Sequence, residues 1–242
     1  MILLIDVGST RLKWATWDGQ FQFGDALAHA EKPLEIFSTL SLTKVSAVWI
    51  SLVPRMGDVE GWSAAVQQKF GIAPHFVQSR AEWRGMRSAY SQPEKLGVDR
   101  WLALVALWNE QPSAFCVVSA GTALTVDRVN AQGQHLGGVI AQGFGSMHRS
   151  LLSATLTTFS DTGHRYGPEL GQDSLAAIAQ GTFFATIGVI GNALRAPGAD
   201  PAERRIITGG DSAALIPYLT GPWQHRPHLV LEGLLALARV QA

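Results

Sequence analysis

Two stretches of the chain share one pattern of apolar and polar positions. Residues 2–17 and 115–129 each open with an apolar run, pass through a turn of small residues, and continue with alternating positions. A short apolar run bounded by turn residues is typical of a buried strand, and alternation with period two is typical of a half-buried one. The turns are Gly8-Ser9-Thr10 and Gly121-Thr122. This repetition predicts two related halves.

Further runs and stripes predict an alternation of strands and helices. We expect strands at 45–52, 74–77 and 205–208, and helices at 62–70, 97–110, 146–156, 173–194 and 229–240. Such alternation indicates an α/β protein. The sequence Gln111-Pro112-Ser113 interrupts the helical pattern, so we place a domain boundary there. The predicted domains are residues 1–113 and 114–242.

Composition narrows the classes of function. Lys plus Arg and Asp plus Glu both number 19, so the net charge is zero and nucleic acid is an unexpected partner. Cys116 is the only cysteine and lies in an apolar run, which predicts a buried, unreactive thiol. The N-terminus lacks the pattern of a signal peptide, and the apolar stretch at 183–190 is judged too short to span a bilayer. We therefore expect a cytoplasmic protein without a membrane partner.

The first turn carries groups that could bind a polyphosphate. Gly8 lets the backbone approach a ligand closely, while turn amides and the hydroxyls of Ser9 and Thr10 can donate to phosphate oxygens. Lys13 adds a positive charge, and Asp6 can hold Mg²⁺ through water. The alternative is an ordinary hairpin turn with a solvated lysine.

The second half offers matching features. Gly121 and Thr122 form the second turn, and Gly209-Gly210 follows an apolar strand where it could approach adenosine. No Gly-x4-Gly-Lys-Ser/Thr sequence occurs, and no Gly-x-Gly-x-x-Gly follows a strand. A P-loop, Rossmann or protein-kinase interpretation therefore lacks support.

Asp99 and Arg100 stand at the start of the predicted helix 97–110. One interpretation is helix capping, because an acidic residue there is stabilised by free amides and the macrodipole. The other is chemical: Asp99 acts as a general base, and the planar guanidinium of Arg100 pairs with a substrate carboxylate. A pair of histidines at 225 and 228 supplies two metal ligands at most, so we interpret it as a loop pair.

Over nearly its full length the chain resembles type III pantothenate kinases. The motifs that carry the resemblance are Asp6-x-Gly8-x-Thr10 with Lys13, Ile50-Ser51 with Val53-Pro54, Tyr90-x2-Pro93-x2-Leu96-Gly97-x-Asp99-Arg100, Gly121-Thr122-Ala123-x-Thr125-x-Asp127, Gly137-Gly138-x-Ile140, Gly181-Thr182, Thr208-Gly209-Gly210-Asp211 and Leu229-x-Leu231-x-Gly233-Leu234. The Gly-x-Asp-Arg block is the most family-specific of them.

The resemblance implies a fold and an activity. The fold is that of two similar actin-like, ribonuclease H-like domains with ATP in the cleft between them. The activity is phosphorylation of pantothenate by ATP, the first step towards coenzyme A, in a homodimeric enzyme. Asp99 would accept the hydroxyl proton, and the residues that would hold pantothenate are Tyr90, Gly97, Val98, Asp99, Arg100 and Thr182. The Asp6–Lys13 turn and Thr122 would hold ATP.

Two further positions bear on cation binding. The family usually has Asp where this chain has Ser119, and that carboxylate helps to bind a monovalent cation. A neutral hydroxyl is a weaker ligand, so we expect dependence on K⁺ to be weakened or replaced, for example by NH₄⁺. Asp127 is a second candidate for Mg²⁺, the alternative being a role in its hairpin.

Two other functions stay open for the protein as a whole. One is a regulatory binding protein that has lost turnover, and the other is an actin-like kinase for another small hydroxylated substrate.

Overall fold

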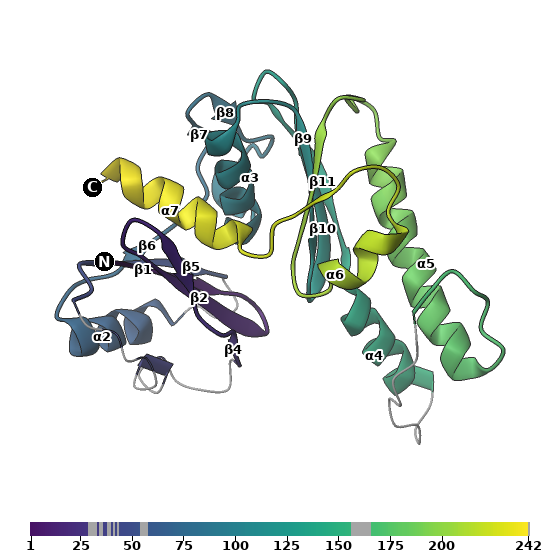
Figure 1. The fold of residues 1–242 in the computed structure, drawn as a ribbon, viewed down its shortest axis with the longest axis horizontal. Helices are drawn as coiled ribbons and strands as arrows, with labels where there is room; N and C mark the ends of the chain where they lie inside the picture. Colours follow the sequence, from purple (N-terminus) through teal and green to yellow (C-terminus); the bar gives the residue numbers. More distant parts are fainter. Residues whose placement is uncertain are drawn as a thin grey trace. The chain divides into compact units, whose positions relative to one another are not determined.

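The computed structural model describes residues 1–28, 33, 36–37, 40, 42, 44–53, 58–155 and 166–241. They form two compact units, each built around one mixed β-sheet (Figure 1). The first unit comprises Met1–Pro112 and His228–Ala242, and the second comprises Ser113–Pro227. The final segment therefore belongs to the first unit, whereas the sequence placed residues 114–242 together.

The sheet of the first unit has the strand order β3-β2-β1-β5-β6, with β4 also paired to β2. β1 and β2 are antiparallel, while β5 runs parallel to β1 and β6 parallel to β5. The bounds are β1 Ile2–Val7, β2 Arg11–Trp17, β3 Phe21–Phe23, β4 Leu27–Ala28, β5 Ala47–Leu52 and β6 His75–Phe76. The predicted strand–turn–strand unit and both later strands of this half are confirmed.

One face of this sheet carries an apolar core. Leu3, Ile5 and Val7 alternate along β1 and pack in a cluster with buried residues of helix α2, Val59–Phe70. The side chain of Asp58 accepts a hydrogen bond of 2.7 Å from a backbone N–H in the first turn of α2. This cap satisfies a free helix donor, so α2 begins before the predicted residue 62.

The opposite face lies against helices α3 (Val98–Glu110) and α7 (Leu229–Gln241), which pack on each other in Figure 1. α7 also contacts β1, β2 and β5. The two helix backbones approach so closely that a Cβ on Gly233 would overlap the carbonyl of Leu102. The domain prediction failed for α7 because its partner helix is distant in sequence and no local pattern identifies it.

Replacing Gly233 with Ala is expected to destabilise the first unit by about 1–3 kcal/mol, the usual cost of overpacking. Gly188, inside helix α5, is the matched control, because a Cβ there would meet no atom within 4 Å. Gly188→Ala should be neutral or stabilising, since glycine weakens a helix interior. Urea unfolding of both variants measures the difference, and equal effects would contradict the close α3–α7 approach.

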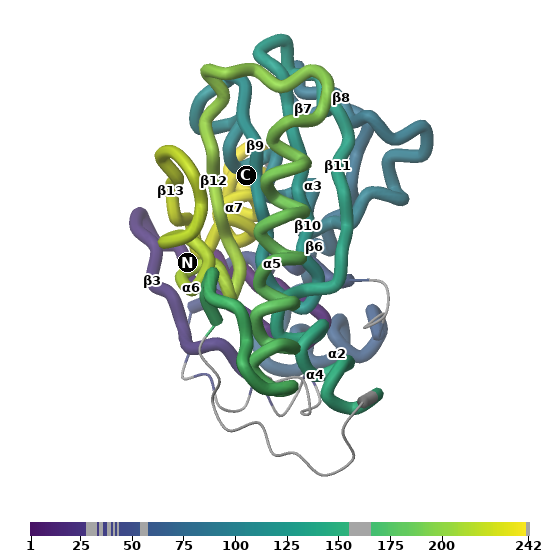
Figure 2. Tube along the Cα trace, turned by 90° about the vertical axis from the view of Figure 1, so that its right-hand side faces the viewer, coloured from purple at the N-terminus to yellow at the C-terminus, as the bar shows by residue number. Residues whose placement is uncertain are grey.

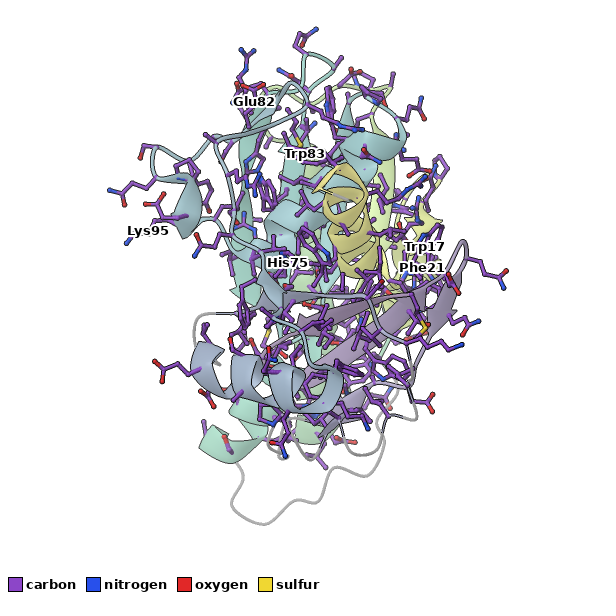
Figure 3. The ribbon with its side chains drawn as sticks, turned by 90° about the vertical axis from the view of Figure 1, so that its left-hand side faces the viewer. Trp17, Phe21, His75, Glu82, Trp83 and Lys95 are labelled. Carbon is purple, nitrogen blue, oxygen red and sulfur yellow. The ribbon has the colours of Figure 1, made fainter. Side chains whose placement is uncertain are left out.

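A short segment leads from β6 to α3 in the first unit. It contains the two-stranded pair β7 (Glu82–Trp83) and β8 (Met86–Arg87) and the 3-10 turn η2 (Pro93–Lys95). Figure 3 shows Trp83 directed inward and Lys95 projecting outward. This small hairpin was not predicted from the sequence.

The second unit repeats the topology of the first. Its strand order is β11-β10-β9-β12-β13, with β9, β10 and β11 antiparallel and β12 and β13 parallel to β9. The bounds are β9 Phe115–Ala120, β10 Ala123–Val129, β11 His135–Gln142, β12 Arg204–Thr208 and β13 Gln224–His225, with helices α4 Phe144–Thr155, α5 Ser174–Leu194 and α6 Ser212–Leu215 and the 3-10 turn η3 Ile216–Tyr218. Figure 2 shows α5 lying over this sheet and running along its strands. The internal repeat predicted from the two turns is confirmed.

Cys116 lies in the apolar core of the second unit, as predicted. Burial, followed by the nearby charge of Glu203, raises the pKa of its thiol to about 12. The thiolate is therefore not formed near neutral pH.

Helix α5 is unusually apolar. Asp173 caps it, with Oδ1 accepting from the N–H of Ala176 at 2.8 Å. By length and composition alone α5 could cross a membrane, which corrects the expectation drawn from residues 183–190, although core helices pass the same test. It packs on α4 and on strands β10 and β11 of its own unit, yet only 33% of its most apolar window is buried.

Candidate active site

Three polar side chains lie in one row across the first sheet. The register places Asp6 of β1 beside Lys13 of β2 on one side and beside Ser51 of β5 on the other. Residues in register project from the same face of a sheet, so a carboxyl, an ammonium and a hydroxyl group are neighbours here. Because Ile5 and Val7 face the apolar core, this row lies on the face covered by α3 and α7.

The turn between β1 and β2 is tight. The N–H of Gly8 donates to the carbonyl of Arg11 at 3.2 Å, and a Cβ on Gly8 would crowd the same oxygen. Ser9 and Thr10 are exposed at the tip, so a ligand can reach their hydroxyls and amides. The predicted phosphate-binding residues of this half therefore share one short hairpin.

The Asp6 carboxyl is buried and resists ionisation. Only 9% of the residue is exposed. Burial and then the negative charge of Asp99 raise its pKa to about 7, against smaller lowering effects of Lys13 and Ser51. The influence of Ser51 on this pKa is the smallest of the four. Among the described residues, neither Asp6 Oδ1 nor Ser51 Oγ has a hydrogen-bond partner.

Asp99 occupies the first turn of α3 without capping it. The N-cap is Gly97, and no side chain makes the cap hydrogen bond. A Cβ on Gly97 would lie 2.8 Å from Asp99 Oδ1, so glycine leaves room for the carboxylate to fold back over the helix start. Since the charge of Asp99 acts on Asp6, the fold joins two carboxyls that are distant in sequence. This arrangement favours the chemical interpretation of Asp99 over the capping one.

Arg100 and Tyr90 form a second polar group beside Asp99. Arg100 is 6% exposed, and Nη1 of its guanidinium donates to the hydroxyl of Tyr90 at 3.0 Å. Its central carbon also lies 5.8 Å from the centre of the tyrosine ring. A buried guanidinium held in one orientation suits bidentate pairing with a carboxylate. Val98, between Gly97 and Asp99, is buried.

In the second unit, two glycines support the β9–β10 turn. The turn closes with Gly121 N donating to Ala123 O at 3.1 Å, and Gly143 N donates to Thr122 O at 3.0 Å. A Cβ on Gly143 would overlap the backbone of Gly121 and Thr122. Gly209 has φ +98°, and a Cβ there would overlap the backbone of Ala120. The predicted turns of this unit are thus packed together through backbone contacts.

Two other predicted residues have partners within the fold. Asp127 is 1% exposed, and its Oδ1 lies 3.0 Å from Nε2 of His135 in the neighbouring strand. This contact favours a role in the hairpin over a role in Mg²⁺ binding. Thr182 is fully buried in α5 and its hydroxyl donates to Ile178 O at 2.9 Å. Its assignment to pantothenate binding stays a prediction.

Asp6 fits a hydrated Mg²⁺ better than a fully coordinated one. Within the described part of the chain, no three His, Cys, Asp or Glu side chains gather as a metal cluster. Mg²⁺ retains much of its water and often uses one or two carboxylates together with substrate phosphates. A buried carboxylate oxygen without a donor, as at Asp6, is suited to that role.

The duplicated sheet topology, with a turn of small residues after the first strand of each unit, defines the actin-like ATPase class of fold. Solved structures agree. A protein from Campylobacter jejuni described as a Baf family transcriptional activator has a TM-score of 0.63 at 19% identity, covering 99% of this chain and 98% of that one. The activator of 2-hydroxyisocaproyl-CoA dehydratase from Clostridium difficile, with bound ADPNP, has a TM-score of 0.57 at 9% identity, covering 99% and 95%.

Sequence comparison gives the family. The sequence model of type III pantothenate kinase matches residues 2–196. A type III pantothenate kinase of Nitrosococcus oceani is 34% identical over 254 aligned positions, covering 99% of this chain and 94% of that protein. The chain belongs to the type III pantothenate kinase family, and it is a phosphotransferase of the actin-like fold.

Sequence reasoning missed two contributors to these groups. Ser51 was part of the family resemblance but received no role, because its place beside Asp6 follows only from the β1–β5 register. Gly143 was not singled out at all. The signal that could have found it is a glycine shortly before a predicted helix and after an apolar segment, where close backbone approach is common.

Proposed function

We propose that this enzyme transfers the γ-phosphoryl group of ATP to the primary hydroxyl of pantothenate, the first step of coenzyme A biosynthesis. The observation that carries the proposal is the placement of Asp99 and Arg100 in the first turn of α3, on the face of the sheet that carries the Asp6 row, in a chain of this family. Pantothenate is an anion with a hydroxyl to phosphorylate, so it matches a fixed guanidinium and a neighbouring base.

Each group of site residues has its own role in the proposed phosphoryl transfer. The pantothenate oxygen forms a bond to the γ-phosphorus while the bond to the β,γ-bridging oxygen breaks, and ADP leaves. Asp99 takes the hydroxyl proton. Arg100, oriented by Tyr90, pairs with the carboxylate and holds the hydroxyl near that base. The turns at Gly8–Thr10 and Gly121–Thr122 supply amides and hydroxyls to the phosphates, and Asp6 would hold Mg²⁺, which neutralises phosphate charge when bound.

The test is ADP release by the purified chain with Mg²⁺ and ATP, with and without pantothenate. Release that requires pantothenate and yields phosphopantothenate in equal amount supports the proposal. ATP turnover with a different hydroxylated compound would point to another actin-like kinase. Binding of ATP and pantothenate without turnover would favour a regulatory binding protein.

We also propose that the enzyme depends only weakly on K⁺. Ser119 of β9 is in register with Thr125 of β10 and Thr208 of β12, so this row presents hydroxyls and no carboxylate. Rates should change little among Na⁺, K⁺ and NH₄⁺ buffers. Ser119→Asp should create a stronger preference for K⁺, and a saturable K⁺ requirement in the unmodified enzyme would contradict the proposal.

The oligomeric state and the cellular location of the enzyme are a further part of the proposal. We propose a cytoplasmic homodimer with small-molecule substrates and neither nucleic acid nor membrane as a partner. The zero net charge supports the absence of a polyanionic partner. Exposed apolar side chains of the second unit, such as Ile140 at 64% and Phe184 at 45%, support association through that unit. Sedimentation equilibrium measures the mass directly.

A further inference from the structure

The Gly209–Gly210 turn of the second unit is fixed on one side and open on the other. Gly209 has a positive φ, and its Cα lies against the backbone of Ala120. The N–H of Asp211 also donates to Ala120 O at 3.0 Å. In contrast, a Cβ on Gly210 would meet no atom within 4 Å. The Gly210 side of the turn is therefore open to a ligand, whereas the Gly209 side lies against backbone.

Ser212 holds the peptide group between the two glycines. It is 1% exposed, and its hydroxyl donates to Gly209 O at 2.6 Å, while its N–H donates to the same oxygen at 3.3 Å. In a planar trans peptide the C=O and the following N–H point in opposite directions. Holding the Gly209 carbonyl against Ser212 therefore directs the Gly210 N–H away from α6.

His225 holds Ser212 in turn. Its Nε2 lies 2.8 Å from the Ser212 hydroxyl oxygen. The parallel pairing of β12 and β13, with Ile207 opposite His225, brings the ring to this place. Because the Ser212 hydroxyl already gives its only proton to Gly209 O, His225 Nε2 carries a proton and donates it. His228, the second histidine of the sequence pair, instead stacks on Phe23 at 3.8 Å in the first unit.

We propose that His225 is a positioning residue for the nucleotide: through Ser212 it orients the Gly209–Gly210 peptide so that the Gly210 N–H donates to the nucleoside triphosphate. The inference rests on the proposed function insofar as it takes this turn to contact ATP. It adds a residue outside the glycine motif and a direction for the amide. A peptide that is already oriented binds more tightly than one that must be ordered by the ligand.

His225→Asn and His225→Gln form a matched pair that tests this chain of contacts. Both carry an amide donor, but only the glutamine amide reaches the place of Nε2. His225→Asn should weaken binding of a non-hydrolysable ATP analogue with Mg²⁺ about 3- to 10-fold, as expected for one lost hydrogen bond. His225→Gln should bind within about 2-fold of the unmodified enzyme.

Ser212→Ala should weaken nucleotide binding as much as His225→Asn. Combining the two substitutions should add little, because both break the same series of hydrogen bonds. Calorimetry measures the affinities.

Kinetics separate positioning from general loss of structure. We expect KM for ATP to rise in His225→Asn while kcat, KM for pantothenate and the unfolding temperature stay unchanged. Unchanged nucleotide affinity in both His225→Asn and Ser212→Ala would overturn the inference, as would equal losses in the Asn and Gln variants. If the unmodified chain binds nucleotide without phosphorylating pantothenate, the proposed function is wrong. The nucleotide affinities of the His225 and Ser212 variants still test the positioning role of His225 in that case. Failure to bind any nucleotide overturns both.

Discussion

Asp99→Asn is expected to lower kcat for pantothenate phosphorylation about 10²- to 10⁴-fold, the usual contribution of a positioned general base. The substitution preserves the shape of the side chain while removing its charge and the oxygen that takes the proton. Affinity for ATP should change little, because the loss concerns an interaction made as the hydroxyl ionises. Steady-state rates at saturating ATP and pantothenate measure the effect.

Glu94→Gln is the matched control for Asp99→Asn. Glu94 is an exposed carboxylate in the η2 turn of the same segment, so the change removes the same charge a few residues away. Its kcat should be unchanged. A kcat for Asp99→Asn within a few-fold of the unmodified enzyme, with folding intact, would show that another group accepts the proton.

The elements with a strong local pattern could be predicted from the sequence. The two hairpins, the parallel strands β5, β6 and β12, and helices α3 and α7 carry apolar runs or stripes, while α5 was predicted from its long apolar stretch. The two-residue strand β13 was not predicted. β11 was missed because Gly137-Gly138 interrupts its pattern and most of its side chains are exposed. The β7–β8 pair was missed because two-residue strands leave almost no periodicity.

The residues of the candidate site could be predicted from the sequence, but most of the contacts between them could not. The β1–β2 turn keeps Asp6 and Lys13 together by local pairing, so the sequence shows that link. The charge interaction between Asp6 and Asp99, and the place of Ser51 beside them, depend on how β5 and α3 pack on β1. The same holds for α7, whose partner is a helix distant in sequence. Non-local packing of this kind leaves no periodic signal in the chain.

Asp6→Asn is expected to stabilise the metal-free protein while abolishing activity. The folded protein raises the Asp6 pKa from 3.8 to about 7, so the folded state binds this proton more tightly than the unfolded state. Between those two values the unfolded chain loses the proton first, and stability therefore falls as pH rises. Above about pH 7 the ionised carboxylate costs on the order of 4 kcal/mol relative to an ordinary aspartate. Asparagine has no such cost.

Urea unfolding without Mg²⁺ at pH 5 and pH 8 measures this effect. The gain in stability of Asp6→Asn over the unmodified protein should be larger at pH 8 than at pH 5 by roughly 1–3 kcal/mol. Asp99→Asn should give part of the same gain, because removing the Asp99 charge lowers the Asp6 pKa towards its ordinary value. Asp58→Asn is the control for loss of an aspartate charge, since that carboxylate caps α2 and lies outside the Asp6 row.

Mg²⁺ with an ATP analogue should reverse the order of stability. A bound cation favours the ionised carboxylate, so ligands should stabilise the unmodified protein more than Asp6→Asn. The Asp6 carboxylate would then destabilise the free protein and strengthen its complex with the ligands. This combination is expected where a buried charge serves ligand binding at the expense of stability. Equal stabilisation of both proteins by Mg²⁺ and nucleotide would assign the metal to other groups. A stability difference independent of pH would show that Asp6 is already ionised in the folded state well below pH 7.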